Sequence, residues 1–115
     1  MKNETTFQIE RQNLQKLFSD RQFEDAETLA TRMLDDYNRF DYELLLKRAR
    51  IRQCLMKYEE AIYDANLALN VLPNKPEAYT QLSDCFIACQ KLPDAAKMLR
   101  QLKKLNPSNS EQIDQ

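Results

Sequence analysis

Three cysteines are the side chains in this sequence best suited to chemistry. Cys85 and Cys89 are four residues apart, so they share one face if the segment is helical, and Cys54 lies further upstream. Three thiolates could begin a zinc site, but structural zinc takes four ligands and the sequence has no histidine to supply the fourth. A redox role is the other chemical alternative. We favour a third interpretation, in which these small, soft side chains fill the seam between helices, and we expect no metal and no cofactor.

Most other catalytic sites lack the residues to build them. Without histidine, the sequence contains no Ser-His or Cys-His nucleophile pair. Without glycine, it contains no glycine-rich phosphate loop, so no nucleotide-binding signature is left. We therefore expect a protein that is not an enzyme.

A basic run extends from Lys47 to Arg52. Spread around a helix, its side chains point several ways and form no single stripe for nucleic acid. The isoelectric point near 5.5 and the lack of an accompanying aromatic stacking platform also argue against RNA binding through Arg48, Arg50 and Arg52. Two interpretations stay open, a solvated charged face or ligand contact through Lys47 and Arg50. For Arg52 we expect a stem that covers the core and a head that reaches solvent or a nearby acid.

The elements that position these residues follow from a four-residue phrase that occurs three times. An aromatic residue or leucine, two residues that are usually acidic, and an alanine recur as Phe23-Glu24-Asp25-Ala26, Tyr58-Glu59-Glu60-Ala61 and Leu92-Pro93-Asp94-Ala95. The alanines are 35 and then 34 residues apart. A fixed period in this range indicates stacked supersecondary units rather than one globular core.

Each phrase has the character of a helix start, because carboxylates favour the positive end of the helix dipole. Apolar residues at helical spacing follow every copy and also precede it. Each unit is therefore predicted to be two antiparallel helices joined by a short turn. Small side chains such as Ala61, Ala68 and Ala95 let the helices approach closely.

On these residues the sequence resembles a tetratricopeptide repeat (TPR) array. Repeat two, about 42–75, matches the TPR pattern best. Repeat three, about 76–109, has Leu92 in place of the usual aromatic residue, and repeat one, about 7–41, is degenerate. A short tail, 110–115, follows the third repeat. The second repeat carries the pattern through these residues: Leu45, Ala49, Tyr58, Ala61, Ala68 and Pro73. The resemblance implies an all-α, right-handed α-solenoid of three helix-turn-helix units, with six or seven helices in a single domain, 1–115.

The ends of the helices carry two further expectations. TPR units usually place glycine in the turn between their helices, and here Arg21, Met56 and Gln90 stand in that place. These turns are therefore either strained, at roughly 1–2 kcal/mol each, or differently built. At the beginning of the chain, Thr5 and Gln8 have the spacing of a capping box for the first helix.

Composition points to a cytoplasmic or nuclear protein. The 17 basic and 18 acidic residues are balanced, which argues against a general nucleic-acid or membrane field. No apolar run approaches the roughly 18 residues of a membrane span, and the first residues lack the apolar region of a signal peptide. We expect no membrane contact.

The resemblance extends to small co-chaperone modules, which hold acidic chaperone tails with a carboxylate clamp. The lysine and asparagine of the first repeat of such a clamp fall on Arg11 and Gln15, and the asparagine of the second falls on Lys47. The two third-repeat cations fall on Glu77 and Gln81, so most of the clamp is predicted to be lost.

A groove with two differently charged halves is predicted instead. The residues expected to face this concave groove are Arg11, Gln15, Lys47, Arg50, Gln53, Glu77, Gln81 and Asp84. They make its N-terminal half mainly basic, tempered by Glu43, and its C-terminal half mainly acidic.

Two functions fit this pattern. The first is a protein-interaction module or adaptor that binds a peptide or partner helix in the groove. The second is a self-assembling or scaffold domain of a larger protein, because solenoids usually finish with a polar capping helix. The last helix is instead expected to leave an apolar stripe partly uncovered, formed by Met98, Leu99, Leu102 and Leu105.

Overall fold

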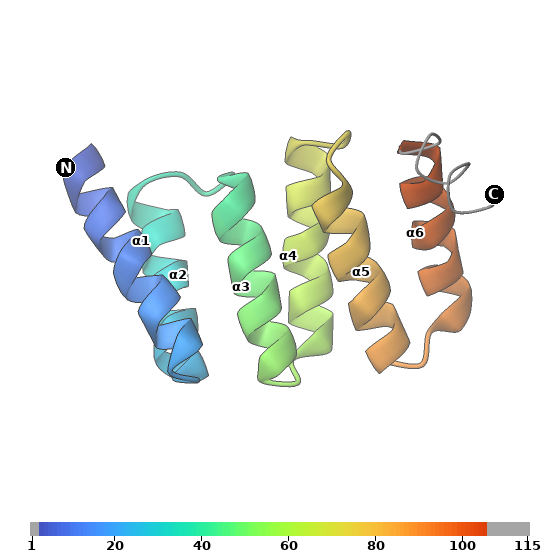
Figure 1. Cartoon of the computed structure of the whole chain (residues 1–115), viewed down its shortest axis with the longest axis horizontal. Helices are drawn as coiled ribbons and strands as arrows, with labels where there is room; N and C mark the ends of the chain where they lie inside the picture. The colour runs from blue at the N-terminus through green and yellow to red at the C-terminus, as the bar shows by residue number, and fades with distance from the viewer. Residues whose placement is uncertain (1–2, 106–115) are drawn as a thin grey trace.

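The computed structural model describes residues 3–105, and this part of the chain is entirely helical, with no strand. Its six helices are α1 (Glu4–Ser19), α2 (Phe23–Asp36), α3 (Tyr42–Cys54), α4 (Tyr58–Val71), α5 (Pro76–Ala88) and α6 (Leu92–Leu105). They follow one another along the long axis and alternate in direction (Figure 1). This arrangement confirms the predicted all-α solenoid of helix-turn-helix units. The predicted tail, 110–115, and the end of the third repeat after residue 105 lie outside the described residues.

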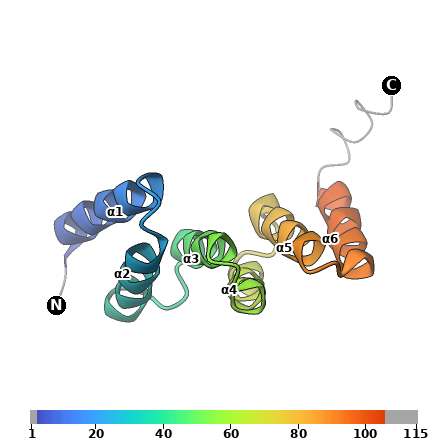
Figure 2. The ribbon, with the colours of Figure 1, turned by 90° about the horizontal axis from the view of Figure 1, so that it is seen from below.

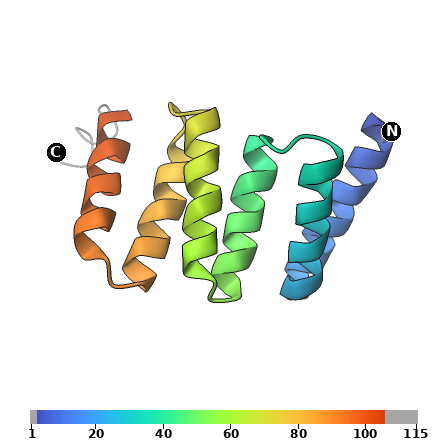
Figure 3. The same ribbon diagram turned by 180° about the vertical axis from the view of Figure 1, so that it is seen from behind.

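The helices form two rows. Helices α1, α3 and α5 lie on one side of the solenoid, and α2 and α4 lie on the other (Figures 2 and 3). Helix α3 packs against both α2 and α4, α5 packs against both α4 and α6, and α3 also contacts α5. The row of α1, α3 and α5 therefore carries the groove-facing residues that the sequence predicted.

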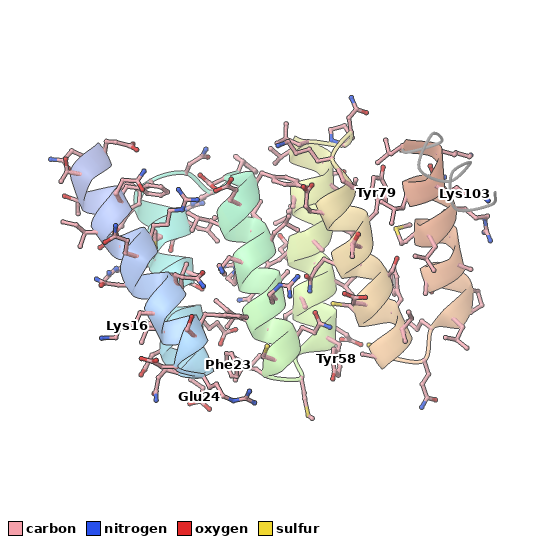
Figure 4. The ribbon with its side chains drawn as sticks, viewed as in Figure 1. Lys16, Phe23, Glu24, Tyr58, Tyr79 and Lys103 are labelled. Atoms are coloured by element: carbon pink, nitrogen blue, oxygen red, sulfur yellow. The ribbon has the colours of Figure 1, made fainter. Side chains whose placement is uncertain are left out.

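The recurring phrase begins the second helix of every pair. Phe23, Tyr58 and Leu92 are the first residues of α2, α4 and α6, and Figure 4 labels the first two near the lower edge of the molecule. The alanine of each phrase is buried, with exposed fractions of 0% for Ala26 and Ala61. Ala61 lies in a core cluster with Ala49, Ala65, Leu82 and Cys85. The prediction that Ala61 sits where helix surfaces meet is confirmed.

The sequence left two alternatives for the turns within the helix pairs, and the structure contains the strained one. Arg21, Met56 and Gln90 have φ angles of 63°, 62° and 62°. In the second turn, Met56 N–H donates to the Gln53 carbonyl at 3.0 Å and Lys57 N–H donates to the Arg52 carbonyl at 2.8 Å. The other two turns repeat this pair of bonds, which defines the Schellman motif. Non-glycine residues therefore occupy the left-handed position of all three turns.

The predicted capping box at Thr5 and Gln8 is wrong. The N-cap of α1 is Asn3, whose side chain accepts the Thr6 N–H at 2.9 Å. Thr5 lies inside the first turn, where its side chain no longer precedes the helix, and Gln8 Nε2 donates to Glu4 Oε1 at 2.8 Å. Asparagine is one of the strongest N-cap residues, so the helix begins earlier than the Thr5 signal indicated.

Candidate functional site

An open cleft of about 510 Å³ lies on the row formed by α1, α3 and α5. It holds four of the predicted groove residues: Lys47, Arg50, Glu77 and Gln81. Other lining residues, which sequence reasoning missed, are Phe7, Asp41, Tyr42, Leu46, Leu72 and Lys75. Part of the cleft wall is thus apolar, and the charged side chains that line it include both cations and carboxylates.

Lys47 is the centre of the basic group. Its Nζ donates to Gln15 Oε1 at 2.7 Å and lies 4.8 Å from the centroid of the Phe18 ring. Burial, together with the positive charges of Arg50 and Arg11, lowers the pKa of Lys47 below its ordinary value. A bound anion would relieve this crowding of cations.

Arg11 and Gln15 come to the same place from α1. They line a smaller cavity of about 150 Å³, which shares Phe7 and Lys47 with the main cleft. Arg11 Nη2 pairs with Glu43 Oε2 at 3.2 Å, both side chains being exposed. Glu43 thus offsets part of the positive charge at the basic end of the cleft. Because both side chains are exposed, this ion pair contributes little to stability.

Tyr42 organises the acidic end. Its hydroxyl donates to Glu77 Oε2 at 3.3 Å and accepts the Ala78 N–H at 3.3 Å. Burial raises the pKa of Tyr42, and the negative charge of Glu77 adds to the shift. Lys75 Nζ lies 5.9 Å from the centroid of the Tyr42 ring, so a cation lines the cleft together with Glu77. The division of charge is therefore less sharp than the sequence predicted.

Gln53 and Asp84 do not line the cleft, and Gln81 lines it but is largely buried. Gln81 is only 4% exposed, and its Nε2 donates to Gln53 Oε1 on α3 and lies 3.8 Å from Cys85 Sγ. Gln81 is therefore partly committed to the contact between α3 and α5. Asp84 is exposed on α5, one turn further on, and does not line the cleft.

The cysteines have three different environments. Cys85 is buried in the core between α3, α4 and α5, and this burial raises the pKa of its thiol, which lowers its reactivity. Cys89 is half-buried, but Cys54 is exposed at the end of α3, so the prediction that it fills a seam is wrong. Among residues 3–105, no three His, Cys, Asp or Glu side chains are grouped as a metal site. None of the helices in this range has the length and apolar character of a membrane span.

An ion network lies between α2, α3 and α4, and sequence reasoning missed its central acid. Asp64 is 0% exposed and accepts two bonds from Arg48, from Nε at 2.8 Å and from Nη2 at 2.7 Å. It also accepts Arg52 Nη1 at 2.9 Å. Arg52 Nε donates to Glu27 Oε2 at 2.8 Å, and Lys57 Nζ donates to Glu27 Oε1 at 2.8 Å. The prediction that the head of Arg52 reaches a nearby acid is confirmed.

This network shifts the protonation of its half-buried members. Burial alone would raise the pKa of Glu27, but the bonds from Lys57 and Arg52 outweigh it and lower the pKa. Burial likewise opposes the charged form of Arg52, yet Glu27 and Asp64 raise its pKa. The network thus ties the first helix pair to the second behind the cleft. No local feature of the sequence distinguished Asp64 from the other acidic residues of α4.

Helix α6 leaves much of its apolar stripe accessible. Leu99 is 47% exposed and Leu92 is 61% exposed, while Met98, Leu102 and Leu105 are half-buried. Ala95 is the only buried residue of this helix. The stripe is therefore partly uncovered, as the sequence predicted, with Leu99 the one exposed member of the four predicted residues.

No family model matches this sequence, and a comparison with curated proteins gives no significant match. Solved structures are similar in fold. The first TPR of Spaghetti (RPAP3), bound to the HSP90 peptide SRMEEVD, superposes with a TM-score of 0.81 at 24% identity, over 91% of this chain and 82% of that one. The TPR2AB domain of yeast Sti1 in its pHSP90 complex gives 0.84 at 25% identity, over 97% of this chain and 45% of that one. The chain folds as three tetratricopeptide repeats.

The likeness of this TPR domain is not restricted to co-chaperones. PcrH in complex with the chaperone binding region of PopB gives a TM-score of 0.85 at 17% identity, over 93% of this chain and 86% of that one. At that identity the similarity shows the fold alone. Each of these three structures contains a bound peptide or protein partner, and the chain spans less than half of the longer Sti1 structure.

Proposed function

We propose that this TPR domain is a protein-interaction module that binds a peptide or partner helix in the cleft of α1, α3 and α5, and that it does so without a complete carboxylate clamp. The observation that carries this proposal is the position of Lys47. Its ammonium group has a lowered pKa, lies among Arg11 and Arg50, and borders an open cleft with apolar side chains. A binding role without catalysis, in the cytoplasm or nucleus, agrees with the composition of the chain.

The cleft favours a ligand with an order of charges. The acidic end of the ligand would lie near Lys47 and Arg50, and its basic end near Glu77, with Asp84 beyond the cleft on the same helix, since like charges in the reverse placement would repel. Between these ends, Phe7 and Leu46 offer apolar surface for a side chain of the ligand.

The same order of charges in the cleft disfavours the purely acidic chaperone tails that a carboxylate clamp holds. Glu77 and Gln81 occupy the two third-repeat clamp positions, and neither is a cation. Gln81 is also largely buried and bonded to Gln53, so it is poorly placed to meet a ligand. Lys75 is the nearest cation that the cleft supplies at this end.

Charge reversal in the cleft tests the proposal. Fluorescent peptides with an acidic end, an apolar centre and a basic end serve as the probe, and SRMEEVD serves as the purely acidic comparison. Lys47→Glu with Arg50→Glu should weaken binding of the charge-ordered peptide at least about tenfold without changing helicity. Glu77→Lys should strengthen binding of SRMEEVD, since it restores one cation. Lys16→Glu with Lys97→Glu makes the same change of charge away from the cleft and should leave both affinities unchanged.

One outcome would reject the cleft as the binding surface. If the double reversal at Lys47 and Arg50 binds the charge-ordered peptide as tightly as the unchanged protein, binding lies on another surface. Circular dichroism and the melting temperature of each variant separate a loss of binding from a loss of folding.

A self-assembling or scaffold domain is the alternative function. The observation that favours it is the 47% exposure of Leu99 on α6. Light scattering and analytical ultracentrifugation at high concentration test it directly. A strict monomer that binds no apolar dye would reject self-assembly through this helix.

A further inference from the structure

The three second helices of the repeats can be compared position by position. Ala30 on α2, Ala65 on α4 and Leu99 on α6 are equivalent, since they follow the periods of 35 and 34 residues. Ala30 and Ala65 are both 0% exposed, whereas Leu99 is 47% exposed. The same face of the helix is therefore buried twice along the solenoid and accessible at its end.

What buries this face in the inner repeats is the first helix of the next repeat. Helix α3 covers α2, and α5 covers α4, where Ala65 packs in one cluster with Leu82 and Cys85. The exposed face of α6 thus has the position and the geometry of a helix-docking surface. We call it the α6 face and define it by Leu92, Leu99, Arg100 and Lys103.

The charge of the α6 face differs from that of its inner equivalents. Arg100 takes the place of Thr31 and Asn66, and Lys103 takes the place of Leu34 and Leu69. Leu34 is only 3% exposed and Leu69 is half-buried, so Lys103 occupies a position that a docked helix covers. Thr31 is half-buried and Asn66 is exposed, so Arg100 lies at the rim of the covered face, where the flank of a docked helix would reach it. The printed sequence thus places two cations where the inner helices are neutral.

No carboxylate offsets these cations in the described part of the chain. The ion pairs described within residues 3–105 all join side chains between Glu10 and Asp64, and none of them involves a residue of α6. Lys103 lies on the last helix, at the end of the solenoid (Figure 4). A helix that covers Leu99 must therefore bring its own negative charge.

We propose that the α6 face binds an acidic amphipathic helix of a partner protein, whose apolar residues cover Leu92 and Leu99 and whose carboxylates meet Arg100 and Lys103. The surface is separate from the cleft and does not depend on it. A second copy of the chain is a poorer occupant, because symmetric pairing of two α6 helices would bring Arg100 and Lys103 of both copies together. Like charges placed opposite each other disfavour such a contact.

A designed peptide tests the proposal on the full chain. The probe is a fluorescent helical peptide of about 18 residues, with leucine at helical spacing on one face and glutamate on both flanks. A second peptide has lysine in place of every glutamate. Fluorescence anisotropy at low and high salt should show binding of the glutamate peptide alone, and this binding should weaken as salt rises.

Two matched charge reversals on the same helix locate the contact. Arg100→Glu with Lys103→Glu should weaken binding of the glutamate peptide at least about tenfold. Lys97→Glu with Lys104→Glu changes the charge equally. Lys97 is equivalent to Thr28 and Tyr63, and Lys104 is equivalent to Asp35 and Asn70, and all four of these inner residues are exposed. This control should leave the affinity within about twofold of the unchanged protein. Leu99→Ser should also weaken binding, since it removes the apolar centre of the face.

Other results overturn the proposal. If the lysine peptide bound as tightly as the glutamate peptide, or if both double reversals weakened binding equally, Arg100 and Lys103 would not select an acidic ligand. A dimer that Leu99→Ser dissociates would assign the face to a second copy, and binding to anionic lipid vesicles in place of the glutamate peptide would assign it to a membrane. If a chain ending at residue 105 bound the glutamate peptide more than about tenfold tighter than the full chain, residues 106–115 would be the occupant.

Discussion

Replacement of Asp64 by asparagine is the sharpest test of what holds the helix pairs together. Asp64 is fully buried on α4 and accepts both Arg48 and Arg52 from α3. The side chains of these arginines are only 14% and 15% exposed, so water cannot take over the role of the carboxylate. Asparagine keeps nearly the same volume but removes the negative charge.

The expected loss of stability follows from this burial. Removing one partner of a buried ion pair costs about 3–5 kcal/mol, because the opposite charge is left without compensation. Arg52 keeps Glu27 at 2.8 Å, so the lower part of that range is expected, near 3 kcal/mol. For a domain of this size such a loss lowers the melting temperature by on the order of 10 °C.

The assay is urea and thermal unfolding followed by circular dichroism. Glu60→Gln is the matched control, because Glu60 is 57% exposed and lies 3.9 Å from the same Arg52. An exposed pair of this kind contributes about 0–1 kcal/mol. If Asp64→Asn cost no more than Glu60→Gln, the network would not be a stabilising element and the reasoning would be refuted. Asp64→Leu with Arg48→Met should recover part of the loss, because it removes both partners of the tightest pair.

The remaining predictions concern turns, packing and pH. Met56→Gly should raise the free energy of unfolding by about 1 kcal/mol in urea melts, since glycine adopts the left-handed φ of 62° without strain; a loss of stability would contradict the Schellman assignment. Ala61→Leu should lower the free energy of unfolding by about 1–3 kcal/mol, because the larger side chain overpacks the core. Ala88→Leu, at an exposed site, is the control and should change the stability little. Equal melting temperatures of the two variants would count against the helix register. The pKa of Glu27 is lower in the folded state than its ordinary value of 4.5, so its contribution is present above that pH and is lost as the pH falls through the folded pKa. Melts between pH 6 and about 3 should therefore be less pH-dependent in Glu27→Gln than in the unchanged protein.

Local sequence features determined the helices and their order. The acidic helix starts and the apolar spacing each depend on a few neighbouring residues, and the period of 34 to 35 residues is the recurrence of these short patterns. Together they predicted the helix pairs that the structure contains. The absence of glycine likewise limited the turns at Arg21, Met56 and Gln90 to two alternatives, strained or differently built, and the structure decided for the first.

Only the tertiary structure decided which charged side chains meet. Asp64 is one acid among many in the sequence, and its burial follows from how α4 is rotated toward α3. The same holds for Lys75 and Phe7, which come to the cleft from segments 68 residues apart and carried no local signal. The exposure of Cys54 also depends on which helix lies beside it. Periodicity tells which face of a helix is apolar, whereas the neighbour that covers this face, and the charges that it brings, are set by packing between helices.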